Sequence, residues 1–315
     1  MSAPADYLLY PNRRLGNEHA FYPWSNSFDR DPLQLPDGKR VALVVVPVLE
    51  WFPLNMQSGP VKPIGQIDGA YPDIWPFTVR EYGNRIGIYR LLRLLERMGA
   101  RGSIALNAAI AQRYPVLTRD LVHSGAELIA HGLDMESLHH SLLEPEAERE
   151  MIARSFSTLR DITGASIDGW HSPAFSESAR TLEFAVAAGA SFALGWANDD
   201  LPYEFSTQAG TLVMVPTSYE MDDASVIREY GNSARNFATQ ITQAYERFSR
   251  EGGRVLTVML HAWISGQAMN IQAVEDSLLA IARNSDCWVA TAGEIADLYR
   301  KQTDRGQFQQ DRGAR

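Results

Sequence analysis

The chain has 315 residues, 45% of them hydrophobic and 21% charged, which is the composition of a globular protein and excludes a disordered or fibrous one. Its 29 basic and 38 acidic residues give a formal net charge of −9, which repels phosphate backbones and anionic lipid and argues against nucleic-acid binding. The single cysteine, Cys287, excludes an intrachain disulfide, and no apolar run approaches the ~20 residues of a membrane span.

Residues 1–40 are predicted to form an irregular N-terminal arm. Prolines from Pro4 to Pro36 interrupt the segment, and Asp37-Gly38 suits a turn before the first strand. The segment lacks the basic-then-apolar order of a signal peptide, so we expect a cytoplasmic protein. The arm would serve as a lid or as a contact with a second subunit.

Strands and helices alternate along residues 41–300. Residues 41–48 are apolar and rich in valine, as a buried strand is, and residues 52–84 are interpreted as a long loop that lines a site. Apolar residues recur at helical spacing over 88–98, and Gly99 suits the end of that helix. Further strands are predicted at 102–106, 127–130, 167–170, 191–194, 212–215, 255–260 and 288–290, and further helices at 108–124 with a break near Pro115, 145–163, 177–188, 234–250, 271–283 and 292–300.

This alternation predicts an α/β fold in which helices cover a parallel sheet. The chain shows no internal repeat and no dividing linker, and its length suits one (β/α) barrel of seven or eight units. We expect this barrel over residues 41–300, followed by a polar, disordered tail over 301–315.

Polar side chains follow the predicted strands at their carboxyl ends. These ends open on one face of a parallel barrel, where active sites are built. Glu50, His131, His171 and His261 each follow a different strand, which favours a proton-transfer or metal site over separate structural histidines. The other candidates at strand ends are Trp51, Asn107, Trp170, Trp196 and Asp199.

Several other kinds of site are not encoded. The sequence holds no Gly-x-Ser-x-Gly elbow, no phosphate-binding or dinucleotide-binding glycine loop and no His-Glu-x-x-His helix. His139 and His140 match no specific metal-ligand spacing. The alternative to a metal-binding role is that both lie in a solvated loop. Cys287 has no histidine nearby and is interpreted as buried filler.

Nine short segments recur in an order that is more specific than any of them alone. They are VPVLEWF (46–52), REYGNRIG (80–87), ALNAA (105–109), AHG (130–132), GWHSP (169–173), WANDDLPY (196–203), LH (260–261), GQ (266–267) and ATAGEIA (290–296). In them the chain resembles the polysaccharide deacetylase (NodB-homology) superfamily, in particular its branch of uricolytic-type allantoinases and cyclic imide hydrolases. The resemblance implies a deformed (β/α) barrel that hydrolyses a carbon–nitrogen bond.

The sequence departs from this family where the family binds a metal. The family has an Asp-Asp pair of base and metal ligand where this chain has Glu50 and Trp51, and a second histidine where Met135 follows His131. Of the three metal ligands in the family's Asp-His-His triad, only one therefore has a clear counterpart in this chain, His131. The strand-end acid and the three histidines would still suit Zn²⁺, so a zinc enzyme and a metal-independent one both stay open.

Amide hydrolysis needs an activated water, a stabilised oxyanion and a proton for the leaving nitrogen. We assign Glu50 as the base, with a pKa that burial raises, and His261, which matches the family's general-acid histidine, as the acid. His131 and His171, the latter in place of a family arginine, would stabilise the oxyanion as imidazolium donors or through a metal. Asp199 matches a family aspartate and would orient a histidine.

The remaining candidates would bind substrate. Trp51, Trp170 and Trp196 suit the walls of a pocket for a planar ring, with packing in the barrel core as the alternative, and Asn107 would contact the same ligand. We predict a hydrolase of a small cyclic amide, ureide or imide, working as a homo-dimer or homo-tetramer by family analogy. Two alternatives stay open: a metal-dependent carbohydrate N-deacetylase, and a non-catalytic barrel that binds a small molecule or glycan.

Overall fold

Strand β1 (Val41–Leu49) pairs with three other strands of a nine-stranded sheet in the computed structural model, which describes residues 19–56, 59–63, 72 and 74–313. All of its residues are buried, as expected for a strand covered on both faces. It pairs in parallel with β8 (Arg254–His261) on one side and with β9 (Cys287–Ala290) on the other. The remaining strands are β2 (Ser103–Leu106), β3 (Glu127–Ala130), β4 (Gly169–His171), β5 (Phe192–Leu194), β7 (Gly210–Val215) and the antiparallel edge strand β6 (Tyr203–Thr207).

The sheet curls into a barrel that no continuous ladder closes. Between β7 and β8 the described residues make an isolated parallel bridge from Asp222 to Met259. The backbone N–H of Val255 also donates to the carbonyl of Asp200 at 3.2 Å. These contacts close the gap locally, so the predicted deformed (β/α) barrel is confirmed.

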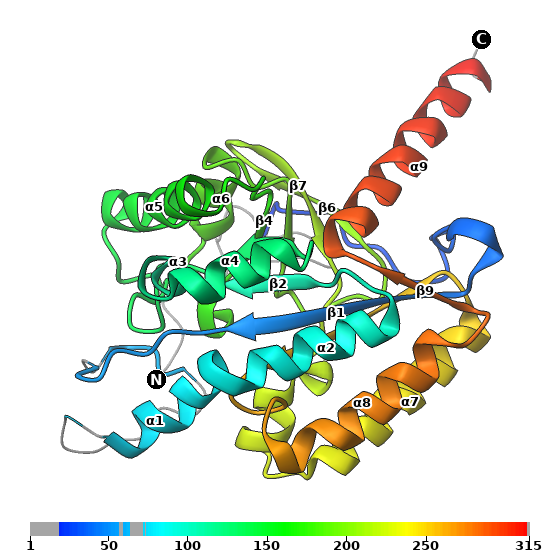
Figure 1. Cartoon of the computed structure of the whole chain (residues 1–315). Helices are drawn as coiled ribbons and strands as arrows, with labels where there is room; N and C mark the ends of the chain where they lie inside the picture. Colours follow the sequence, from blue (N-terminus) through cyan, green and yellow to red (C-terminus); the bar gives the residue numbers. More distant parts are fainter. Residues whose placement is uncertain (1–18, 57–58, 64–71, 73, 314–315) are drawn as a thin grey trace, which may run out of the picture.

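Helices surround the barrel (Figure 1). The helix predicted at 145–163 is confirmed residue for residue, because Pro145 suits its first turn and Gly164, at φ 65°, ends it. The break near Pro115 is also confirmed. The helices are α1 (Ile74–Tyr82), α2 (Ile88–Met98), α3 (Ala108–Arg113), α4 (Pro115–His123), α5 (Pro145–Thr163), α6 (Thr181–Ala187), α7 (Ala234–Glu251), α8 (Ala268–Ala282) and α9 (Ala292–Gly313).

Strand side chains fall into two apolar layers, because successive residues point to opposite faces. In β1, Val44, Val46 and Val48 pack inside the barrel, whereas Leu43 and Val45 pack under the helices. The alternation therefore carries every second residue at a strand end into the mouth of the barrel. The polar residues that continue the inner series are Glu50 after β1, Asn107 after β2, His131 after β3, His171 in β4 and His261 in β8.

Three segments differ from the sequence-based prediction. The expected loop 52–84 contains α1, because Pro76 lies in the first turn, where proline is tolerated. Strand β6 was not predicted, although Tyr203 and Phe205 alternate with polar residues as in a half-buried strand. Residues 301–313, expected to be a disordered tail, continue α9 as a helix.

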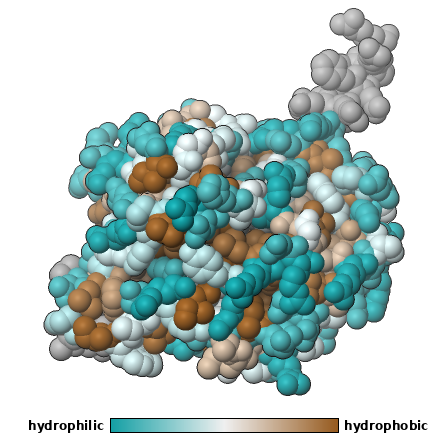
Figure 2. Space-filling view, viewed as in Figure 1, coloured by the Kyte–Doolittle hydropathy of each residue, from teal (hydrophilic) through white to brown (hydrophobic). Residues whose placement is uncertain are grey.

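The outer surface is mainly polar. On the face in Figure 2, hydrophilic residues surround scattered hydrophobic ones. None of the helices in the described ranges combines the length and the apolar character that a membrane span requires.

Candidate active site

Four of the predicted residues converge at the carboxyl ends of the strands. Oε1 of Glu50 lies 3.7 Å from Nε2 of His261 and 4.0 Å from Nε2 of His131. The ring of His131 stacks on that of His171, with centroids 4.6 Å apart and planes inclined by 8°. All four side chains are buried, so the barrel mouth contains one acid among three imidazoles.

The hydrogen bonds of two histidines assign their protons. Nδ1 of His131 lies 2.9 Å from the carbonyl oxygen of His171, and Nδ1 of His171 lies 3.3 Å from that of Leu194. Because a carbonyl oxygen only accepts, Nδ1 carries the proton in both rings. Nε2 of His131 is then buried without a hydrogen-bond partner, and it faces Glu50.

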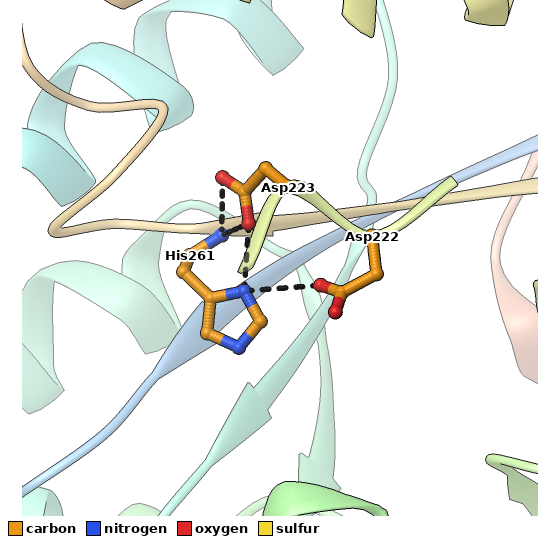
Figure 3. A group of neighbouring side chains, drawn as sticks. All are labelled: Asp222, Asp223 and His261. Carbon is orange, nitrogen blue, oxygen red and sulfur yellow. Dashed lines mark hydrogen bonds and ion pairs between the residues drawn. The ribbon is translucent and has the colours of Figure 1, made fainter. Parts of the chain in front are cut away.

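Two aspartates hold His261 (Figure 3). Its Nδ1 lies 2.7 Å from Oδ1 of Asp223 and 3.3 Å from Oδ1 of Asp222, while Nε2 points away from both. Asp223 also accepts from the backbone N–H of His261 and of Ser265, and Asp222 accepts from the backbone and hydroxyl of Ser225. The pair fixes the orientation of the ring and stabilises its charged form.

Asp199 does not have the predicted position. Its carboxylate accepts from the backbone N–H groups of the next two residues and pairs with Arg30. Its neighbour Asp200 bonds to Val255 at the amino end of β8, six residues and therefore about 20 Å before His261. The loop after β5 thus runs back along the barrel, and the two aspartates that follow β7 orient the histidine instead. Sequence gave no signal for them, because they lie seven and eight residues beyond the strand.

The predicted tryptophan walls are also placed differently. Trp170 is fully buried on the helix side of β4, stacked on Phe156, with its indole N–H bonded to Ser172. Trp196 donates to Glu177 and packs edge-on within an aromatic cluster beside β6. Both therefore serve packing, which was the alternative interpretation. Trp51 is half-buried, and its ring lies under the guanidinium of Arg113 at 3.9 Å.

Other aromatic residues, missed from the sequence, line the site. The ring of Phe175 meets His171 edge-on at 5.0 Å and Tyr219 at 5.1 Å. Its backbone has φ 54°, a left-handed conformation that is strained for a bulky residue and typical of functional positions. Trp263 donates its indole N–H to Oε2 of Glu50 at 2.8 Å.

The surroundings give Glu50 and His261 opposite charges. Burial would raise the pKa of Glu50, but the charge of His261, the neighbouring ring of His131 and the hydrogen bond from Trp263 outweigh it and lower the pKa. Burial would lower the pKa of His261, but Glu50 and Asp222 outweigh it and hold that pKa well above 6.5. The site therefore pairs a carboxylate with an imidazolium, and the raised pKa expected for Glu50 is wrong.

Two other histidines are held neutral. Burial and the neighbouring His131 lower the pKa of His171 well below its usual value, which does not suit the imidazolium role predicted for it. Burial lowers the pKa of His139 to about 4. His139 packs against Trp170, with Nδ1 3.7 Å from Glu148, so it does not lie in a solvated loop.

The donor set does not fit the family's metal. Within the described ranges, the one group of three possible ligands is Asp222, Asp223 and His261, in which both aspartates already pair with Nδ1 of the histidine. The acid and three imidazoles of the mouth do not supply three ligand atoms within 4.8 Å of one another. Met135, at the position of the family's second histidine, is buried in an apolar cluster with Phe52. We therefore derive no step through a metal.

Part of the chain is similar to known proteins in sequence. Residues 83–193 match the family model of polysaccharide deacetylases. The peptidoglycan deacetylase-like protein FGM2 of Gibberella zeae is 23% identical over 146 residues, which cover 46% of this chain and 40% of that protein. This chain thus spans less than half the length of that relative.

Solved structures resemble the whole barrel. A probable polysaccharide deacetylase from Pseudomonas aeruginosa PAO1 superposes with a TM-score of 0.76 at 21% identity, over 86% of this chain and 95% of that one. PuuE allantoinase gives a TM-score of 0.76 at 19% identity, over 86% and 94%. These likenesses show the fold. With the family-model match they confirm the predicted resemblance to the polysaccharide deacetylases and to the allantoinase fold.

Asn107 serves the backbone rather than the cavity. Its fully buried amide accepts from the N–H of Trp51 at 2.8 Å and donates to the carbonyl of His131. It therefore ties the end of β1 to the end of β3. Asn107→Ala should lower the free energy of unfolding by about 2–4 kcal/mol, since it leaves buried polar groups unpaired. Urea unfolding measures this loss, with the exposed Asn236→Ala as control, and equal stability of the two variants would contradict the structural role.

Proposed function

We propose that the chain hydrolyses a carbon–nitrogen bond in a small cyclic amide, ureide or imide, with Glu50 as base and His261 as acid. The observation that carries this proposal is the 3.7 Å separation between Oε1 of Glu50 and Nε2 of His261 in a buried site. A carboxylate and an imidazolium at this spacing are able to act on the two sides of one scissile bond.

The first step is the attack of water. Glu50 accepts a proton from water while the water oxygen bonds to the carbonyl carbon of the substrate. The π electrons of the carbonyl group move to the carbonyl oxygen, which becomes the oxyanion. Nε2 of His131 is the polar atom beside Glu50 without a partner. Nε2 of His131 is the proposed contact of this oxyanion, while Nδ1 keeps its bond to the carbonyl of His171.

The second step is the departure of nitrogen. The carbon–nitrogen bond breaks as the oxyanion electrons re-form the carbonyl, and His261 transfers its Nε2 proton to the leaving nitrogen. The carboxylates of Asp222 and Asp223 hold Nδ1 throughout and keep the ring aligned. Glu50 then returns its proton to His261, so one water is consumed and an acid and an amine are produced.

The surroundings favour a small, planar substrate. Phe175 and Tyr219 offer ring faces next to His171, and Trp51 lies beside the base. The allantoinase named above shares the fold, and cyclic ureides belong to the proposed class. A carbohydrate deacetylase of the family type would need the metal set that this mouth does not provide.

Two expectations about the whole protein remain proposals. Family analogy suggests a homo-dimer or homo-tetramer, and a cytoplasmic location is the second of these proposals. Sedimentation and cell fractionation test them independently of the chemistry.

A substrate panel tests the reaction. Hydantoins, cyclic imides and acetylated sugars, each with and without a chelator, should give turnover on a cyclic substrate that the chelator does not reduce. Turnover on acetylated sugars alone, or turnover lost on chelation, would point to the metal-dependent deacetylase instead.

Glu50→Gln keeps the shape of the side chain and removes the base. We expect kcat to fall at least ~10²-fold because general-base catalysis contributes about that much. Steady-state kinetics on the best panel substrate measures it, with the exposed Glu96→Gln of α2 as matched control. Unchanged turnover in Glu50→Gln would refute the assignment.

His261→Ala removes the acid. We expect kcat to fall ~10²-fold or more with little change in KM, because the proton is needed in the transition state rather than for binding. The exposed His123→Ala of α4 is the control. An effect confined to KM would make His261 a binding residue.

The pH dependence follows from the two pKa shifts. Activity needs ionised Glu50, whose pKa lies below its usual 4.5, and protonated His261, whose pKa lies above its usual 6.5. The rate should therefore fall on the acid side, below pH 4.5, as Glu50 gains a proton, and on the alkaline side, above pH 6.5, as His261 loses one. A rate that rises steadily through pH 6.5 would exclude His261 as the acid.

A further inference from the structure

The motif at residues 80–87 has no role in the steps above. It forms the end of α1 and a π-helical turn (Gly83–Gly87), a rare geometry that is frequent at functional sites. The turn packs on residues 262–266, the loop that leaves β8 directly after His261. It therefore touches the segment that carries Trp263.

Glycine makes this contact close. A Cβ at Gly83 would lie 2.6 Å from the backbone nitrogen of Trp263, and one at Gly87 would lie 1.9 Å from the carbonyl oxygen of Ala262. From the same turn, Asn84 donates to the carbonyl oxygen of Glu50 at 3.3 Å. One element thus fixes both the backbone of the base and the loop opposite it.

Trp263 connects the glycine turn at residues 83–87 to the side chain of Glu50. Its buried indole donates to Oε2 of Glu50 at 2.8 Å, and the guanidinium groups of Arg80 and Arg228 lie 5.9 and 5.5 Å from its ring. The other oxygen, Oε1, is the one that faces His131 and His261. The two oxygens of the carboxylate therefore have different partners.

We propose that Trp263, seated by the glycine turn at residues 83–87, is a positioning residue that anchors one oxygen of Glu50 and leaves the other to take the proton from water. This role rests on the proposed function. An unanchored carboxylate would rotate and divide its lone pairs between several directions. With Oε2 bonded, Oε1 stays aimed at the space in front of the two imidazoles.

The anchor also affects protonation, because a hydrogen bond to the ionised form favours that form. The groups that face Glu50 are His131 from β3 and His261 from β8, with Asp222 and Asp223 behind the latter. Trp263→Phe leaves these charges in place and removes one N–H donor. It isolates the hydrogen bond from the remaining electrostatics.

The first test is kinetic. In Trp263→Phe, kcat should fall about tenfold with KM nearly constant, and the acid limb of the kcat–pH profile should move up by about one unit. Trp288→Phe, in β9, is the matched control and should leave the profile unchanged. A fall in kcat with an unmoved acid limb would overturn the anchoring role.

The second test needs neither substrate nor a folded Trp263 variant. In the native protein labelled with ¹⁵N-tryptophan, the indole N–H signal of Trp263 should titrate with Glu50, and Glu50→Gln should shift this signal and abolish its titration. No indole signal responding to Glu50→Gln would overturn the proposal. A native protein inactive on the whole panel but with a titrating indole would refute the proposed function and leave the anchor standing.

Discussion

The arrangement of side chains in the barrel mouth depends on buried acidic and basic groups that offset one another's charge. Glu50, Asp222 and Asp223 are three carboxylates taken out of water, and each alone would be costly. His261 lies between them, with one ring nitrogen toward the base and the other toward the aspartates. Removing its charge would leave the three acids with neutral donors alone, namely backbone N–H groups, a hydroxyl and the indole N–H of Trp263. The same contacts that make the acids tolerable also hold the imidazole protonated and aligned.

The period of two along a strand explains which site residues sequence could predict. Glu50, His131, His171 and His261 converge because each continues the inner side of its own strand into the barrel mouth. The same rule places Trp170 on the helix side, and applying it to β4 would have removed this residue from the list of pocket walls. The predicted strand boundaries were accurate enough to show which side of the sheet each residue faces, even where they differed from the observed boundaries by one or two residues.

Residues on connections were not predictable in the same way. Asp199 lies five residues beyond the end of β5, yet its loop returns toward the amino end of the barrel. Asp222 and Asp223 follow β7 at a distance and reach the mouth through a single bridge to Met259. The path of a loop depends on tertiary contacts that no local pattern encodes. Phe175 and Trp263 belong to the same class, since each reaches the site from a segment beyond a strand.

The pKa of Glu50 was expected to rise, and the reason it falls bears on how the site works. Burial by itself would raise it, but the nearby imidazolium of His261, the ring of His131 and the hydrogen bond from Trp263 count for more. A less basic carboxylate takes a proton from water less readily. The orientation of its reactive oxygen toward the water is therefore more important. In the proposed reaction, catalysis would rely on an ionised carboxylate that is held in one direction and opposed by a charged imidazole 3.7 Å away. The apolar Met135, where the family has a ligand histidine, is consistent with a mouth organised around an ion pair instead of a metal.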